Sequence, residues 1–285
     1  MLLQTLQGLA FGVQVRHIAT TPLSCCSVSD SVEAVLAADE WKLYSQIPVR
    51  EGDCTCGVLE RSALRDVDGL VRQAMKPLDD SMLVAAGAPL TDFLQIAAGS
   101  TYRLVVDGGK VNGIITRSDL QKLPVRIVIF TFVTNLELLM ADVIRSFAPA
   151  PAEWRQYLSE DRRERVKSKF DQLSRSDFYV DELTCTDFCD KRTILKGFLN
   201  DLSKDFTKDL KQIEKLRNSV FHAGEYAQNQ QELAVLVDQY ERARRWTNDL
   251  QRRLREHTGG VKTPIAAGTT FEATDDDVAQ AERPA

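Results

Sequence analysis

The sequence predicts an α+β protein with an N-terminal α/β region followed by an all-helical bundle. In residues 14–123, short apolar runs rich in β-branched residues are separated by turn signals such as Asp-Gly-Gly. From about residue 124 the strand signals stop and long helical patterns begin. A chain of 285 residues also exceeds the size at which a single core is most common. Two folding units are therefore expected.

The N-terminal region contains two candidate strand pairs. The first is SQIPV with CTCGVL, and the second is TYRLVV with VNGII. Each pair flanks a turn signal, as a β-hairpin does. An amphipathic helix candidate precedes each pair (residues 30–44 and 89–99), and a short helical segment, RSALRDV or RSDLQKL, follows it. The predicted order helix, strand, strand, helix therefore occurs twice.

The letters of the two halves also repeat. A shift of 56 places lays residues 57–64 on residues 113–120, with identical Gly, Arg, Ser and Leu positions. Self-similarity at a fixed spacing indicates an internal duplication. We expect the two halves to share one backbone arrangement.

The second repeat carries the motif GIITRSD, residues 113–119. A strand that ends at Thr116 and a helix that begins there would bring backbone N–H groups and a hydroxyl to a phosphate. One turn later, Asp119 could accept hydrogen bonds from a ribose diol. The same Thr-x-x-Asp spacing is close to a capping box, which needs no ligand. Both interpretations stay open at this point.

The repeat and the motif together resemble a tandem pair of CBS domains, which bind adenosine-containing ligands in many regulatory proteins. Gly113, Thr116 and Asp119 match the family pattern of Gly, two apolar residues, Thr or Ser, two variable residues and Asp. The resemblance implies an adenine nucleotide such as AMP or ATP as a regulatory ligand. The first repeat has Glu60 for the Thr and Ala63 for the Asp. Since a carboxylate repels phosphate, we expect one working cleft at most.

The C-terminal half predicts five helices. They span about 125–147, 159–173, 191–202, 204–222 and 230–256. The first is the only membrane candidate, but Asn135, Glu137 and Asp142 interrupt it, which favours a buried core helix. It follows the second repeat through Pro124 with little slack, so motion in one region could reach the other.

An arginine interrupts the apolar stripe of the fourth helix. At about 100° per residue, Arg217 lies about 40° from Ile213 and inside the stripe. The stripe consists of Phe206, Leu210, Ile213, Leu216 and Val220. A buried, unpaired guanidinium is costly, so an anion should face it. Glu137 is the internal candidate, and a partner chain or an RNA phosphate is the external one.

The stretch Arg217-Asn218-Ser-Val-Phe-His222 resembles the RN-x-x-x-H signature of HEPN domains, all-helical modules found in many metal-independent ribonucleases and in toxin and antiviral systems. The resemblance implies His222 as general acid or base on a ribose 2′-OH and Arg217 as the stabiliser of the phosphorane charge. Asn218 would orient the histidine or hold a phosphate. It further implies a homodimer with a composite cleft. Taken alone, a helix-end histidine is most often a surface residue.

The expected organisation has an N-terminal segment at 1–13, CBS repeats at 14–71 and 72–123, a HEPN-like bundle at 124–257 and a disordered tail at 258–285. A net charge of −5 gives no global attraction to nucleic acid or to anionic membrane. The six cysteines follow no secretory signal, so we expect reduced thiols, a cytoplasmic location and no metal site.

The leading functional hypothesis is a nucleotide-sensing CBS module that controls a HEPN-like ribonuclease. The alternative is a non-catalytic regulator whose helical half only dimerises or binds a partner. The sequence contains no nucleophile constellation, phosphate-binding loop or set of metal ligands that would indicate a metabolic enzyme.

Overall fold

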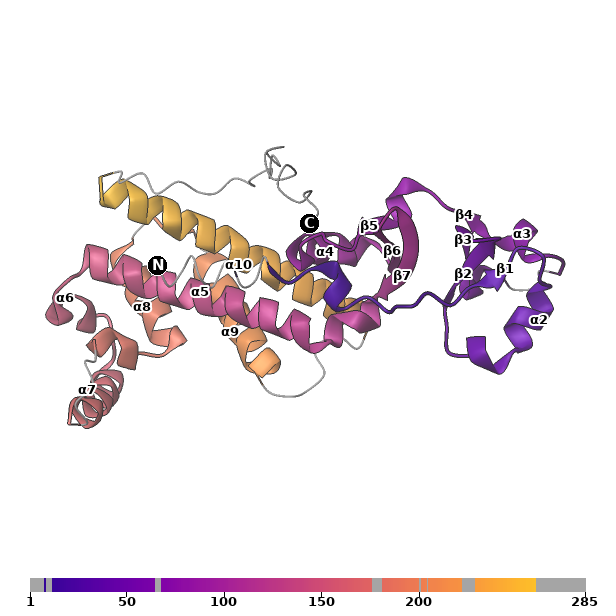
Figure 1. Cartoon of the computed structure of the whole chain (residues 1–285). Coiled ribbons are helices and arrows are strands. Elements are labelled where there is room, and N and C mark those ends of the chain that lie inside the picture. Colours follow the sequence, from indigo (N-terminus) through magenta and orange to yellow (C-terminus); the bar gives the residue numbers. More distant parts are fainter. Residues whose placement is uncertain are drawn as a thin grey trace, which may run out of the picture.

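The computed structural model describes most of the chain outside its two ends. The described residues are 8, 12–64, 68–175, 181–199, 201–203, 205–221 and 229–259. Two small sheets come first, and a group of long helices follows (Figure 1). The predicted α+β class is confirmed, because a mixed α/β region precedes a helical one.

The first sheet has four short strands in the order β1-β2-β3-β4. They are β1 (Cys26–Ser27), β2 (Gln46–Glu51), β3 (Cys54–Glu60) and β4 (Lys76–Pro77). β1 runs parallel to β2, and the other neighbours are antiparallel. The turn between β2 and β3 uses Gly52 at a φ of +57°, a conformation that favours glycine.

The second sheet has three strands in the order β5-β6-β7. They are β5 (Leu83–Ala85), β6 (Tyr102–Asp107) and β7 (Lys110–Thr116). β5 runs parallel to β6, and β6 runs antiparallel to β7. Both predicted strand pairs are therefore confirmed, whereas β1, β4 and β5 were not predicted.

The strand register confirms the duplication. Gln46 pairs with Glu60 in the first sheet, and the shift between the repeats carries this pair onto Tyr102 and Thr116, which pair in the second. The irregularity between Val49 and Arg50 recurs at the equivalent place, between Val105 and Val106. The two halves thus share one hairpin down to its bulge.

Each sheet also borrows a segment from outside its predicted repeat. Lys76 pairs with Val58 in the first sheet, and Thr20 forms the corresponding bridge to Ile114 in the second. The shift between the repeats carries Thr20 onto Lys76 and Val58 onto Ile114, so the two pairings are equivalent. The boundary predicted between residues 71 and 72 stays a prediction, but the sheets do not follow it.

The helical pieces of the two repeats are short. They are η1 (Val15–His17), α2 (Val32–Ala37), η2 (Asp39–Trp41), η3 (Arg61–Ala63), α3 (Val71–Ala74), η4 (Asp80–Met82), α4 (Leu90–Ile96), η5 (Ala97–Gly99) and η6 (Arg117–Gln121), where η denotes a 3-10 turn. The helix predicted over residues 30–44 is wrong in its extent, because the chain becomes extended at Ala38. This break lets Trp41 enter the core of the first repeat.

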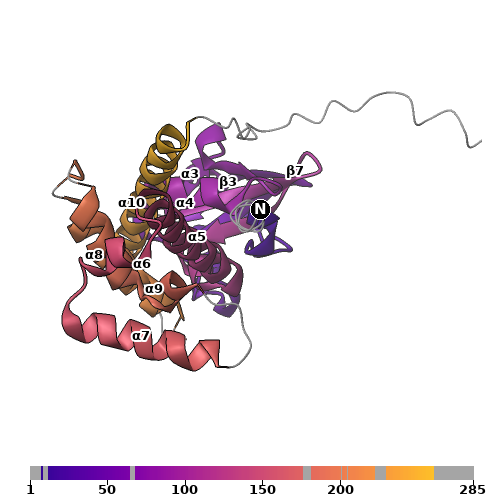
Figure 2. The same cartoon turned by 90° about the vertical axis from the view of Figure 1, so that its left-hand side faces the viewer.

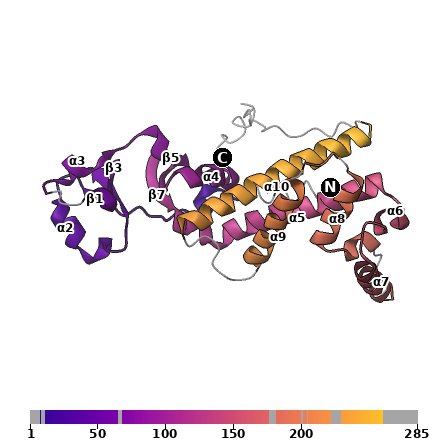
Figure 3. The same cartoon turned by 180° about the vertical axis from the view of Figure 1, so that it is seen from behind.

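The helical region confirms the five predicted helices to within a few residues and adds two short elements. Its members are α5 (Leu123–Phe147), α6 (Pro151–Arg155), α7 (Glu160–Ser174), η7 (Glu182–Cys185), α8 (Phe188–Phe198), α9 (Asp205–Phe221) and α10 (Gln230–His257). α5 and α10 run side by side over most of their length (Figures 1 and 3). α7 lies at the edge of the bundle (Figure 2).

Among the described helices, α5 alone is long and apolar enough to cross a membrane by length and composition. A core helix passes the same test, and 61% of the apolar window of α5 is buried inside the fold. α5 packs against α8, α9 and α10. This packing agrees with the predicted core helix.

One hydrophobic core is shared by the second repeat and the helical region. Leu90 and Phe93 of α4 and Leu120 of η6 belong to the same buried cluster as Val125 and Ile129 of α5. α10 contributes further apolar side chains to this cluster. The first repeat has a separate core, and it lies at the end of the molecule away from the helices (Figure 1).

The connection between the second repeat and α5 is as short as predicted. Lys122 follows η6 directly and is the N-cap residue of α5, with Pro124 in the first turn of the helix. The ammonium of Lys122 donates to the carbonyl of Ile18 at 2.6 Å. A displacement of η6 would therefore act directly on the start of α5.

Candidate functional site

A cleft of about 450 Å³ lies between the two repeats. The second repeat supplies the end of β7 and the start of η6, and the first repeat supplies the turn that leads into β2. The lining residues are Thr20, Leu43, Tyr44, Ser45, Gln46, Thr101, Ile114, Thr116, Arg117, Ser118 and Asp119. The volume is in the range of small-molecule sites.

Thr116 and Asp119 both line this cleft. They also form a capping box, which was one of the two interpretations of the motif. The Asp119 carboxylate accepts hydrogen bonds from the Thr116 backbone N–H at 2.6 Å and from its hydroxyl at 2.9 Å. Its other oxygen lies 2.6 Å from the ammonium of Lys122. Asp119 is buried, and Thr116 and Lys122 of the protein itself already pair with its carboxylate.

Gly113 does not line the cleft. A Cβ atom at this position would lie 2.7 Å from the Cγ2 atom of Thr21 and 3.0 Å from the carbonyl oxygen of Thr20. The glycine is needed because the crossing segment at Thr20 approaches β7 closely. Its place in the motif is explained by packing within the protein.

Arg117 is the cleft residue that the sequence interpretation missed. It occupies one of the two variable positions of the motif, and its side chain is half-buried. Its Nε atom is buried without a hydrogen-bond partner, and the guanidinium has no ion pair with any residue that the structure describes. A partly buried, unpaired guanidinium is costly. Among the described residues, nothing supplies the anion that this group calls for.

The corresponding groups of the first repeat are already occupied. Arg61 is the equivalent of Arg117 there, and its guanidinium donates to the carbonyl of Tyr44 at 3.0 Å and to that of Trp41 at 2.7 Å. Glu60, which corresponds to Thr116, accepts from the Tyr102 hydroxyl at 3.2 Å. Burial, and then the Glu60 carboxylate, raises the pKa of Tyr102 well above its usual range.

Arg61 also shapes the cleft from the other side. The carbonyls that it binds belong to the turn that carries Leu43 and Tyr44, and both of these side chains line the cleft. The arginine of the first repeat therefore holds one wall, and Arg117 of the second faces the space between the walls.

In the helical region, the anion that faces Arg217 is Glu137. The guanidinium lies 3.6 Å from a Glu137 carboxylate oxygen, and the buried Lys191 ammonium lies 3.1 Å from the other. Lys191 also donates to the carbonyl of Thr186 at 2.7 Å. The internal candidate named from the sequence is thus correct, and the predicted apolar stripe of α9 is buried as expected.

The structure describes two residues of the proposed Arg-Asn-His set. Arg217 is 36% exposed, and Asn218 is exposed on the last turns of α9. His222 lies outside the described residues. These side chains belong to α9, whereas Thr116 and Asp119 lie in the cleft between the repeats.

The arginines of α10 are mostly engaged with acidic side chains. Arg242 and Arg245 both bind Asp209, which is fully buried and also accepts from the Trp246 indole at 3.0 Å. Burial alone would raise the pKa of Asp209, but the hydrogen bonds from Trp246 and Arg242 outweigh it, so the pKa is lowered. Arg244 likewise pairs with Glu241, so acidic side chains of the helical region engage these three arginines.

All six cysteines are free thiols, as predicted. Among the described residues, Asp187, Cys189 and Asp190 place possible metal-ligand atoms within 4.8 Å of one another. The guanidinium of Arg162 binds both carboxylates at 2.5 Å. The protein therefore already offsets part of the negative charge of this group.

A model of the CBS domain family matches residues 71–126, so the chain contains a CBS domain. The match covers the second repeat with Gly113, Thr116 and Asp119, and it ends in the first turn of α5. The first repeat lies outside it, and its kinship rests on the shift that relates the two repeats. No curated protein matches the sequence.

Several solved structures resemble part of the chain. CBSX2 in complex with AMP is 23% identical, with a TM-score of 0.35 over 41% of this chain and 98% of that one. An uncharacterized conserved protein from Pyrococcus horikoshii is 23% identical, with a TM-score of 0.34 over 39% and 90%. A hexameric CBS-CP12 protein from bloom-forming cyanobacteria is 12% identical, with a TM-score of 0.33 over 74% and 97%.

Proposed function

We propose that this protein senses an adenine nucleotide in the cleft between its two repeats and passes the occupancy to its helical region. The observation that carries the proposal is Arg117, a cleft arginine whose buried Nε has no partner among the described residues. The CBS domain in the same segment supports the choice of an adenosine-containing ligand.

The cleft offers a suitable group for each part of a nucleotide. Arg117 is a donor for a phosphate, and the hydroxyls of Thr116 and Ser118 become donors if the ligand displaces the bonds that they make to Asp119 and to each other. Asp119 can accept from a ribose hydroxyl if the ligand shares or displaces the Lys122 ammonium. Tyr44 is half-exposed at the rim and offers an aromatic face for the base.

The comparison of the two repeats also indicates one nucleotide-binding cleft per chain. In the first repeat the Glu60 carboxylate takes the place of the Thr116 hydroxyl and already binds Tyr102. A phosphate there would meet a negative charge instead of a donor. We expect one nucleotide per chain.

The proposed signal runs through Lys122. This residue binds Asp119 on the cleft side and is the N-cap residue of α5 on the other. A ligand that draws the Asp119 carboxylate away from Lys122 would change the contacts at the start of α5. Because the second repeat and the helices share one core, such a change would reach α10 as well.

Isothermal titration calorimetry with AMP, ADP and ATP tests this proposal. The full chain is expected to bind one of them with a stoichiometry of one, and Asp119→Ala is expected to weaken binding at least tenfold. Asp53→Ala is the matched control, since Asp53 is exposed in the hairpin turn of the first repeat. No heat with any of the three nucleotides, or unchanged affinity in Asp119→Ala, would reject it.

A second candidate is that the helical region cleaves RNA in a homodimer, with His222 as general acid or base, Arg217 on the phosphate and Asn218 orienting the histidine. It is favoured by the partial exposure of Arg217 and Asn218 on one end of α9. Against it, the Glu137 pair already accounts for Arg217, so a non-catalytic helical region needs no further assumption.

Incubation of the purified protein with total RNA, with and without AMP or ATP, separates the two hypotheses. Cleavage that His222→Ala abolishes would support the ribonuclease, and light scattering would show the dimer. Intact RNA under every condition would reject the ribonuclease and favour a nucleotide-responsive regulator without enzymatic activity.

A further inference from the structure

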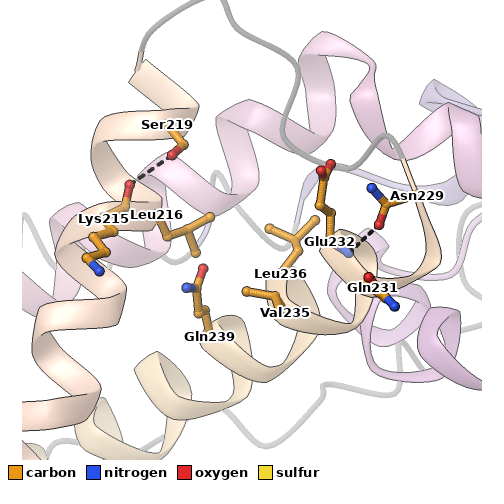
Figure 4. Close-up of a pocket in the computed structure, with 9 residues that line it drawn as sticks. All are labelled: Lys215, Leu216, Ser219, Asn229, Gln231, Glu232, Val235, Leu236 and Gln239. Atoms are coloured by element: carbon orange, nitrogen blue, oxygen red, sulfur yellow. Dashed lines mark hydrogen bonds between the residues drawn. The ribbon is translucent and has the colours of Figure 1, made fainter.

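A second cavity, of about 410 Å³, lies between α9 and α10, away from the cleft between the repeats. Its walls are apolar: Leu216 from α9 faces Val235 and Leu236 from α10 (Figure 4). Lys215 and Ser219 of α9 stand at its rim. The polar residues at the α10 end of the cavity are Asn229, Gln231 and Glu232.

The side chain of Gln239 is the unusual feature of this cavity. It is only 8% exposed, lines the cavity and makes no hydrogen bond with any residue that the structure describes. In Figure 4 the amide lies between the two helices, close to Leu216 and Val235. Its oxygen and nitrogen stay accessible to solvent through the cavity, so a ligand that excludes solvent there must replace the lost hydrogen bonds. A ligand that offers a complementary hydrogen-bonding edge would satisfy the amide.

A row of lysines leads along α9 to this cavity. Lys208, Lys211 and Lys215 share the exposed face of the helix, and a shallow hollow of about 360 Å³ runs along them without an acidic residue in its lining. None of the three has an ion pair with a described residue. They span about 10.5 Å along the helix axis, at 1.5 Å per residue. In a chain of net charge −5, this row of lysines, which have no ion pair among the described residues, ends at the rim of the cavity.

From these observations we infer that the cavity between α9 and α10 binds a nucleobase and that the lysine row binds the phosphate attached to it. A base has two apolar faces for Leu216 and Val235 and a hydrogen-bonding edge for Gln239, whose amide type pairs with base edges in known complexes. A purely apolar group would fill the same space but leave the amide unsatisfied. The base and phosphate come from a free mononucleotide or from single-stranded RNA.

This inference goes beyond the proposed function, because it requires neither the cleft between the repeats nor cleavage of RNA. Arg117 and Asp119 are untouched by changes in α9 and α10. Any nucleotide that binds between the repeats contributes equally in all variants compared below, so the two proposals fail independently.

The test measures binding of AMP, GMP, CMP and UMP by calorimetry, and of a fluorescein-labelled mixed-sequence RNA octamer by anisotropy. Gln239→Leu is expected to weaken binding about tenfold or more. Val235→Glu, at a half-exposed position that tolerates substitution, is expected to do the same by placing a charge on the apolar wall. Each variant is checked by its melting temperature, and Gln239→Leu is expected to melt no lower than the unaltered chain.

The lysine row has its own matched pair. Lys215→Gln is expected to weaken binding severalfold and to lower the slope of log Kd against log salt by about one. Lys167→Gln, on the exposed face of α7, is the control and should bind as the unaltered chain does. Binding of mononucleotides alone identifies a free nucleotide as the ligand, and binding of the octamer alone identifies a strand. Equal binding by all variants, or no binding of any probe, would overturn the inference.

Discussion

The two repeats have the same hairpin but use it differently. In the first repeat, Arg61 is bound by two backbone carbonyls and Glu60 by the Tyr102 hydroxyl. In the second, the buried Nε of Arg117 has no partner among the described residues, and Thr116 lines an open cleft. The equivalent arginine thus holds the fold together in the first repeat, whereas in the second its Nε has no partner among the described residues. The proposed binding site is placed at this arginine for that reason.

The hydrophobic cores of the two repeats also differ. The first repeat encloses its own apolar cluster, whereas the second shares its cluster with α5 and α10. The copy with the open cleft is thus the copy that is fused to the helical region. This arrangement suits the proposed sensor, since the repeat with the proposed binding cleft and the helices belong to one packed unit.

The largest expected effect comes from a matched pair of core truncations. Leu59 and Ile115 occupy equivalent positions of the two repeats, and both are fully buried. Leu59→Ala and Ile115→Ala should each lower the free energy of unfolding by about 2–5 kcal/mol. Hydrogen exchange should rise only in the first repeat for Leu59→Ala, but also in α5 and α10 for Ile115→Ala. Equal, local effects in both variants would contradict the shared core.

The paired glycines give the next largest effect. A Cβ at Gly57 would lie 2.5 Å from the carbonyl oxygen of Lys76, while one at Gly113 would first meet the movable side chain of Thr21. Gly57→Ala should therefore cost about 1–3 kcal/mol by denaturant unfolding, and Gly113→Ala less. The reverse order would show that the two crossing segments are not equivalent.

Removal of Arg61 should have a moderate effect on stability. Arg61→Ala loses two charge-assisted hydrogen bonds to the turn that carries Tyr44, so we expect a loss of about 1–2 kcal/mol in thermal or urea unfolding. Arg117→Ala removes no protein contact of this kind and should leave stability unchanged or slightly higher. A larger loss in Arg117→Ala would mean that its guanidinium has a structural partner.

The smallest effect is expected for Glu60→Gln. The amide oxygen can still accept from the Tyr102 hydroxyl, so stability should change by less than about 1 kcal/mol. Nucleotide stoichiometry should stay at one, because Tyr102 continues to fill the position. A second bound nucleotide in this variant would show that the carboxylate charge alone closes the first repeat.

The sequence predicted the parts of the fold that carry strong periodic signals. β2, β3, β6 and β7 combine β-branched residues with glycine turns, α5 is a long apolar run, and α10 has a long amphipathic pattern. The strands β1, β4 and β5 are two or three residues long, too short for a detectable period, and β4 contains Pro77. The break in the first helix depends on the burial of Trp41, a tertiary contact that local propensity does not encode.

The candidate sites show the same limit. Motif spacing found Thr116 and Asp119, and helix periodicity led from Arg217 to Glu137. Arg117 was passed over as a variable position, although the matching arginine in the first repeat was a usable signal. Gln239 carried no signal at all, because only the packing of α9 on α10 shows that this largely buried residue lines a cavity.

The central claim is that the two equivalent arginines have taken different roles, one for structure and one for ligand. It is tested most directly by calorimetric titration of AMP, or whichever adenine nucleotide binds, into Arg117→Gln and Arg61→Gln side by side. We predict that Arg117→Gln weakens binding about 10- to 100-fold without loss of stability, as expected for a charged hydrogen bond to a phosphate. Arg61→Gln should lower stability and weaken binding by a smaller factor. Equal affinities in Arg117→Gln and the unaltered chain would contradict the account.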